Sequence, residues 1–148
     1  MQTALCTVVG ACITFLMGPA LADDAKIGMV KTIKGSVAVI RDGSRAELSL
    51  GDIVQQNDIL ETGRDGAVGV TFIDNTTLSL GSRTKITLTE YVFHPSQNRY
   101  AFVMEVTKGT LMFVSGMIEK FEPDAVSIHT SVGTVGVRGT RLLIEVPE

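Results

Sequence analysis

A chain of 148 residues has room for one domain, and its formal net charge of −3 is spread over residues of both signs. No Lys/Arg cluster is present, so the composition predicts neither a nucleic-acid partner nor binding to an anionic membrane surface.

The first 22 residues differ from the rest because no charged residue precedes Asp23. The nearly continuous apolar run 4–17 is followed by Gly18-Pro19 and then by Ala20-Leu21-Ala22, the small-x-small pattern of a signal-peptidase site. We therefore predict a signal peptide over residues 1–22, and a periplasmic or secreted protein with no membrane span after cleavage.

Two alternatives to cleavage stay open. The leader could be retained as an anchor, since about 20 apolar residues can span a bilayer, or the chain could be a lipoprotein modified at Cys12. Both cysteines, Cys6 and Cys12, lie in the leader, so cleavage would remove every thiol and with it any disulfide or thiolate metal site. Residues 23–27 are expected to form a polar exit segment.

From residue 28 onward the chain predicts short strands joined by turns. Residues 28–40 are expected to form a strand pair or one bent strand, interrupted at Gly35. Asp42-Gly43 predicts a hairpin, and the strict alternation of residues 45–50 predicts a further strand. Three side chains of that strand are expected to face inward: Ala46, Leu48 and Leu50.

The clearest strand–turn–strand signal begins at residue 67. Alternation over residues 67–72 is followed by Asp74-Asn75, whose short polar side chains suit a turn. Alternation then resumes over residues 78–88. The side chains expected to face inward are Val68, Val70, Phe72, Leu78, Leu80, Ile86 and Leu88.

Residues 100–107 alternate again after a polar loop, and Lys108-Gly109 is expected to form a turn. Pro123 rules out a long helix, but one turn around residues 117–121 is possible. A short strand is expected over residues 126–130. The side chains expected to face inward from the segment before the helix are Tyr100, Phe102, Met104, Val106, Leu111 and Phe113.

Nowhere do apolar residues recur with helical spacing over three turns, whereas strand signals return about every 8–12 residues. We predict an all-β fold with a single domain over residues 28–148. A β-roll or a short β-solenoid is favoured, and a β-sandwich is the alternative.

No catalytic, cofactor or metal site is predicted. His94 and His129 are far apart in sequence, and neither has a neighbour at ligand spacing. The carboxylate pairs Asp58/Glu61 and Glu119/Glu122 fall in turns, whereas a glycosidase needs two carboxylates in a cleft. We therefore expect no enzyme; an activity on envelope polysaccharide is the weakest of the alternatives.

One constellation near the C-terminus stands out, an arginine between glycines in an apolar strand pattern. A buried guanidinium must find carboxylate or carbonyl partners. We predict that Arg138 is structural and bonds inward, to Asp74, to Asp58 or to backbone carbonyls; recognition of an anionic ligand is the alternative. The candidate structural motif comprises Gly136, Arg138, Gly139, Thr140 and Asp74.

Residues 130–140 resemble the closing motif of the FecR-type extracytoplasmic domain. Residues 50–52, 58–63 and 70–74 fit the same family's pattern, and the resemblance covers about residues 28–145. It implies an all-β domain outside the cytoplasmic membrane, with relatives that span the membrane and regulate iron-uptake signalling. Those relatives read a transport receptor in the periplasm and control a sigma factor in the cytoplasm.

We expect no cytoplasmic segment before the apolar leader, so the fold is expected to carry over better than control of a sigma factor. We expect a non-enzymatic extracytoplasmic binding or scaffolding module whose partner is another envelope protein. The alternative is a periplasmic component of an iron-responsive signalling pathway.

Overall fold

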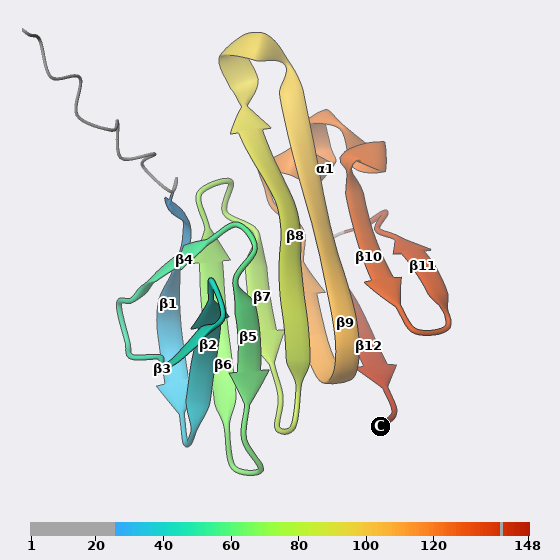
Figure 1. Cartoon of the computed structure of the whole chain (residues 1–148). Coiled ribbons are helices and arrows are strands. Elements are labelled where there is room, and N and C mark those ends of the chain that lie inside the picture. The colour runs from blue at the N-terminus through green and yellow to red at the C-terminus, as the bar shows by residue number, and fades with distance from the viewer. Residues whose placement is uncertain (1–25, 140) are drawn as a thin grey trace, which may run out of the picture.

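The computed structural model describes residues 26–139 and 141–148, which form a single all-β domain (Figure 1). Strands make up 62% of it and helices 9%, and one curled sheet forms a half-barrel. This confirms the predicted fold class. The predicted signal peptide, with Cys6 and Cys12, lies outside the described residues. The first strand begins at Lys26, so the last two residues of the predicted exit segment, Lys26 and Ile27, belong to β1.

The elements follow one another with short connections. The strands are β1 (Lys26–Lys34), β2 (Val37–Arg41), β3 (Ser44–Glu47), β4 (Ile53–Gln55), β5 (Ile59–Thr62), β6 (Ala67–Phe72), β7 (Thr77–Leu80), β8 (Lys85–His94), β9 (Arg99–Val114), β10 (Val126–Thr130), β11 (Gly133–Gly136) and β12 (Arg141–Val146). The helical turns are η1 (Pro95–Gln97), α1 (Met117–Phe121) and η2 (Pro123–Ala125). The single turn of helix expected at residues 117–121 is confirmed.

Strand β9 belongs to both halves of the curled sheet. Residues 99–108 pair with β8, and residues 109–114 pair with β7 and β12. Figure 1 shows β9 running down along β8 and turning back at the base of the molecule. Gly109 allows the bend, because its φ is +103° and a Cβ there would overlap Thr84. The turn expected at Lys108-Gly109 is therefore a bend within one continuous strand.

The two halves have different strand orders. One half is β4-β1-β6-β7-β9-β12, and the other is β3-β2-β5-β8-β9-β10-β11. Pairing is antiparallel throughout except between β9 and β10. Residues 28–40, predicted as a strand pair or one bent strand, form two strands, β1 and β2. These two strands lie in different halves of the sheet.

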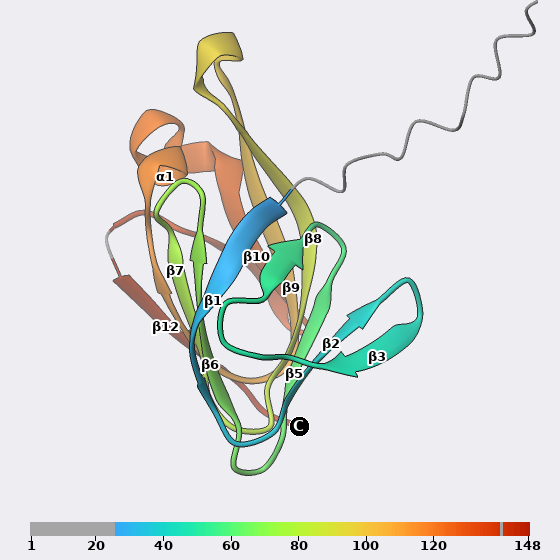
Figure 2. The ribbon, with the colours of Figure 1, turned by 90° about the vertical axis from the view of Figure 1, so that its left-hand side faces the viewer.

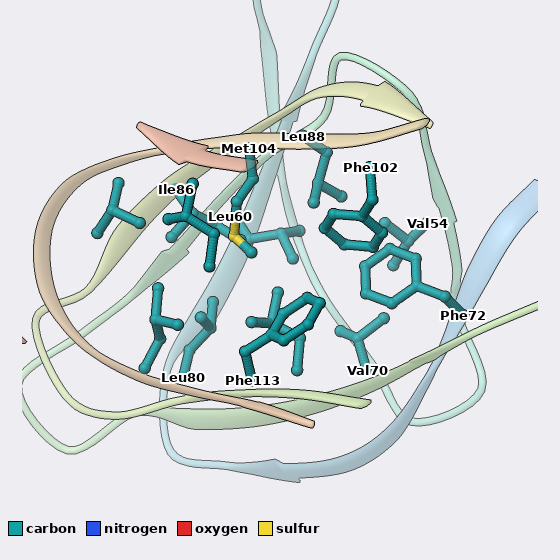
Figure 3. Close-up of a cluster of buried hydrophobic side chains, with 14 of the residues drawn as sticks. Val54, Leu60, Val70, Phe72, Leu80, Ile86, Leu88, Phe102, Met104 and Phe113 are labelled. Carbon is teal, nitrogen blue, oxygen red and sulfur yellow. The ribbon is translucent and has the colours of Figure 1, made fainter. Parts of the chain in front are cut away.

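The core fills the space between the two halves (Figure 3). Twelve of the thirteen side chains predicted to face inward from residues 68–113 are buried, and Tyr100 is half-buried. At its centre the rings of Phe72 and Phe113 each meet Phe102 edge-on, at centroid distances of 4.9 and 5.4 Å. Such edge-to-face contacts add to the stabilisation from buried area.

One predicted inward face is wrong. Leu48 is buried, but Ala46 and Leu50 are exposed, and so is every residue of β3. The β2–β3 hairpin extends away from the rest of the sheet in Figure 2. Since all four residues of β3 are exposed, neither face of this strand packs on the core.

Candidate functional site

The turn that follows β6 holds a buried carboxylate. Asp74 is fully buried, and Asn75 beside it adopts a left-handed conformation with φ of 67°. Both carboxylate oxygens of Asp74 accept hydrogen bonds from Thr76, at 3.2 Å from the backbone N–H and 2.6 Å from the hydroxyl. A buried carboxylate needs such partners, since desolvation without them is costly.

Tyr91 of β8 completes this arrangement. Its hydroxyl donates to Oδ1 of Asp74 at 2.9 Å and accepts the Asp74 backbone N–H at 3.1 Å. Burial, and then the adjacent Asp74 carboxylate, raises the pKa of Tyr91 well above the ordinary tyrosine value. The phenol therefore keeps its proton and remains a donor over the physiological pH range.

The same turn fixes the start of α1. The Ile118 backbone N–H donates to Oδ2 of Asp74 at 3.2 Å, and the Met117 N–H donates to the Asp74 carbonyl at 2.8 Å. Gly116 N–H donates to the Thr76 hydroxyl at 3.1 Å. A Cβ at Gly116 would overlap the backbone of the Asp74 turn, so only glycine allows this close approach.

Within the closing motif, residues 133–136 pair with β10, and residues 138–139 contact α1 and η2. Gly139 N–H donates to Oε1 of Glu119 at 3.1 Å, and the Ser115 hydroxyl donates to the Gly139 carbonyl at 2.6 Å. Val137 is the buried residue of the motif, and Gly136 ends β11 at the surface. Thr140 lies outside the described residues.

Arg138 is exposed, so the expectation that it bonds inward is wrong. Its Nη2 donates to Oδ1 of Asp124 at 2.8 Å, and the two side chains are 78% and 75% exposed. Neither Asp74 nor Asp58 is its partner. The hydrogen bond to Asp124 raises the pKa of Arg138, so the guanidinium stays charged.

A shallow hollow lies beside this ion pair. Its volume is about 290 Å³, and Val137 and Val126 supply apolar side chains next to the charges of Arg138 and Asp124. We call this region, with the hollow and residues 133–139, the closing-motif surface. It presents a cation, an anion and glycine backbone together, groups that can recognise another polypeptide.

The model of the FecR protein family matches residues 58–148, more than half of the chain, including the Asp74 turn and the closing motif. The chain belongs to the FecR protein family. This is a regulatory or signalling family, and it is associated with the cell envelope. The match begins at Asp58, later than the resemblance inferred from residue 28.

No curated protein and no solved structure matches the chain. Within the part of the FecR protein that the structure describes, no helix has the length and apolar character needed to cross a membrane.

Asp58 has a partner that sequence reasoning missed. Nε and Nη2 of Arg41 donate to its two carboxylate oxygens, each at 2.7 Å, and Gln55 N–H adds a bond at 2.9 Å. Asp58 is fully buried, whereas the Arg41 side chain is 37% exposed. The pairing of β2 with β5 brings the two residues together, which no local pattern reveals.

The remaining candidates of this FecR protein do not form a site. His94 and His129 are both exposed, and His129 Nδ1 lies 2.8 Å from the Thr134 hydroxyl. Among the described residues, no group of three or more His, Cys, Asp or Glu could hold a metal ion.

Proposed function

We propose that this FecR-family protein is a non-enzymatic binding or scaffolding module that works outside the cytoplasmic membrane and contacts another envelope protein. The observation that carries the proposal is the closing-motif surface, where an exposed Arg138–Asp124 pair lies beside a hollow. Helix α1 connects this surface to the buried Asp74 turn by hydrogen bonds.

Hydrogen bonds connect the exposed closing-motif surface to the buried Asp74 turn through α1. Asp74 fixes the first turn of α1, and Glu119 of α1 in turn holds the Gly139 backbone. Groups held in place before binding lose less conformational entropy when a partner arrives. This arrangement suits recognition by a fixed surface rather than by a segment that orders on contact.

Arg138 has donors to spare for a partner. A guanidinium carries five N–H donors, and Asp124 accepts from one of its nitrogens. An exposed ion pair contributes little to the stability of the fold, so Arg138 can exchange Asp124 for a partner's carboxylate at little cost in stability. The expected partner therefore presents an acidic group next to an apolar side chain that enters the hollow.

The apolar leader supports a location outside the cytoplasm, in agreement with a family associated with the cell envelope. Mass spectrometry of protein from the native envelope fraction tests this part. A mature N-terminus at Asp23 is expected, one at Met1 would contradict export with cleavage, and a lipidated Cys12 would favour the lipoprotein alternative.

A second candidate is a periplasmic component of an iron-responsive envelope signalling pathway, whose cytoplasmic half is a separate chain. The regulatory character of the family favours it. Neighbouring genes for a sigma factor and a transport receptor would support this signalling role, whereas adjacent adhesin or secretion genes would support scaffolding.

Crosslinked pull-down from the envelope fraction tests the binding role directly. The wild type is expected to capture one or a few proteins reproducibly, and Arg138→Ala is expected to lose them. Arg45→Ala is the matched control, because Arg45 is also an exposed arginine, paired with Glu61 at 3.2 Å on the distant β2–β3 hairpin.

Two results would overturn the proposal. One is equal capture by the wild type and Arg138→Ala, which would place any contact elsewhere. The other is the absence of a partner together with hydrolysis of an envelope polysaccharide that substitution of acidic residues abolishes.

A further inference from the structure

Among the described residues, four strands lie at the margins of the curled sheet with one neighbouring strand each: β3, β4, β11 and β12. A free edge exposes backbone N–H and C=O groups that can pair with another chain, and proteins protect most edges with short strands, charges or irregularities. These four edges differ in how well they are protected.

Three of the edges are protected. Strand β4 has three residues, and β11 has four, of which two are glycine. Strand β3 also has four residues, and two of them are charged, Arg45 and Glu47. None of these three strands is long enough for an extended ladder.

Strand β12 is longer than these three. It has six residues, and Figure 2 shows it at the outer margin of the molecule. Leu143 at its centre is 69% exposed. Within the described residues β12 pairs with β9 alone, so its other edge is open to a further strand.

The outer face of β12 has a charge pattern that is complementary to itself. Ile144 and Val146 point into the core, while Arg141, Leu143 and Glu145 are exposed on the other face. Along the strand, this face therefore presents a positive, an apolar and a negative side chain in turn. Neither Arg141 nor Glu145 takes part in an ion pair among the described residues.

We propose that the free edge of β12 pairs with β12 of a second copy of this chain, antiparallel and centred on Leu143. In this register Leu143 lies opposite its own copy, and Arg141 lies opposite Glu145 of the partner subunit at both ends. Opposite charges and apolar pairs directly across two strands stabilise their pairing.

The parallel orientation lacks this complementarity. Parallel pairing would place Arg141 opposite Arg141 and Glu145 opposite Glu145, so like charges would meet. The antiparallel arrangement has a two-fold axis, and it closes because each copy contributes the same edge. The dimer is separate from the partner contact proposed for the closing-motif surface.

Sedimentation velocity over a range of concentrations tests the dimer, on the full chain expressed with its own N-terminus. The wild type is expected to pass reversibly from monomer to dimer. Amide hydrogen exchange in β12 should slow as the dimer forms, because its free N–H groups become bonded. A wild type that stays monomeric at every concentration would overturn the proposal.

Charge exchange gives the sharper test. Arg141→Glu and Glu145→Arg, each alone, place like charges opposite one another and should raise the dissociation constant about tenfold. The double variant restores both pairs and should dimerise like the wild type. A mixture of the two single variants should form heterodimers, since each supplies the charges that the other lacks.

Leu143→Lys brings two ammonium groups together at the axis and should abolish the dimer. Leu50→Lys is the matched control, because Leu50 is also an exposed leucine, at 64%, but lies in a loop away from β12. Circular dichroism and the melting temperature verify that each variant is folded. A dimer that none of the charge variants alters would overturn the assignment to β12.

Discussion

Two Arg–Asp pairs in this molecule have the same chemistry and opposite surroundings. Arg41 meets the fully buried Asp58 with two hydrogen bonds of 2.7 Å. Arg138 meets Asp124 with one bond of 2.8 Å, and both side chains are largely exposed. The first pair connects strands of the sheet, and the second lies on the closing-motif surface.

The difference shows that the environment, rather than the residue types, decides what an ion pair does. Removal of one partner from a buried pair leaves an uncompensated charge, which costs several kcal/mol. Water and salt screen an exposed pair, so its removal changes stability little. The buried carboxylates Asp58 and Asp74 are thus expected to hold the fold, and Arg138 and Asp124 to be free for binding.

The largest effect is expected at Asp74. Asp74→Ala leaves the N–H of Ile118 and the hydroxyls of Tyr91 and Thr76 without their acceptor, and should lower the free energy of unfolding by about 3 kcal/mol or more. Urea denaturation measures this. Asp124→Ala is the control and should keep the wild-type midpoint. Equal midpoints for Asp74→Ala and Asp124→Ala would contradict the view that the buried carboxylate stabilises the fold more than the exposed one.

Arg41→Ala comes next. It leaves the Asp58 carboxylate buried with the Gln55 N–H among its remaining partners. Because the Arg41 side chain is 37% exposed, water can enter in its place, and we expect a loss of about 2–3 kcal/mol, at the low end for a broken buried pair. Arg45→Ala provides the surface control, and similar unfolding midpoints for the two variants would show that Asp58 needs no cation.

Tyr91→Phe should cost about 1–2 kcal/mol, since it removes a donor to Asp74 and the acceptor of the Asp74 N–H. It should also change the alkaline limit of stability. Because the pKa of Tyr91 is raised in the folded state, its contribution is complete below about pH 10 and is lost as the pH rises further.

Urea midpoints measured between about pH 9 and pH 11 separate this contribution from that of other groups. The difference between the wild type and Tyr91→Phe should shrink as the pH rises through this window. A constant difference would mean that the phenol ionises alike in the folded and unfolded chains.

Local pattern was sufficient to predict most of the strands. Alternation at Val68, Val70 and Phe72 is a property of consecutive residues, and a large core was available to receive them. The same pattern misled at Ala46 and Leu50, because alternation shows that a strand has two faces but not whether a core lies behind one. The bend of β9 at Gly109 was also beyond local pattern, since it depends on pairing with β7 and β12.

The ion pairs show the same limit. The sequence identifies Asp58 and Asp74 as turn residues, but only the neighbouring strands supply Arg41 and Tyr91. The exposure of Arg138 was also beyond local pattern. Val137 is buried and Arg138 exposed, but both lie in the loop after β11, where the alternation of a strand does not apply.

The smallest effect on stability is expected at Arg138, and it is the one that separates the two regions most clearly. Arg138→Ala should leave the melting temperature unchanged, because its guanidinium is 78% exposed and water can solvate Asp124 in its absence. Arg138→Glu places a carboxylate near Asp124 and Glu119, so a small decrease in the melting temperature should appear at low salt. This decrease should vanish at high salt, where exposed charges are screened. The same experiment on Arg41→Ala is the reference. A decrease for Arg138→Ala as large as that for Arg41→Ala, and insensitive to salt, would mean that the guanidinium stabilises the fold from within, and the case for a binding role at the closing-motif surface would be lost.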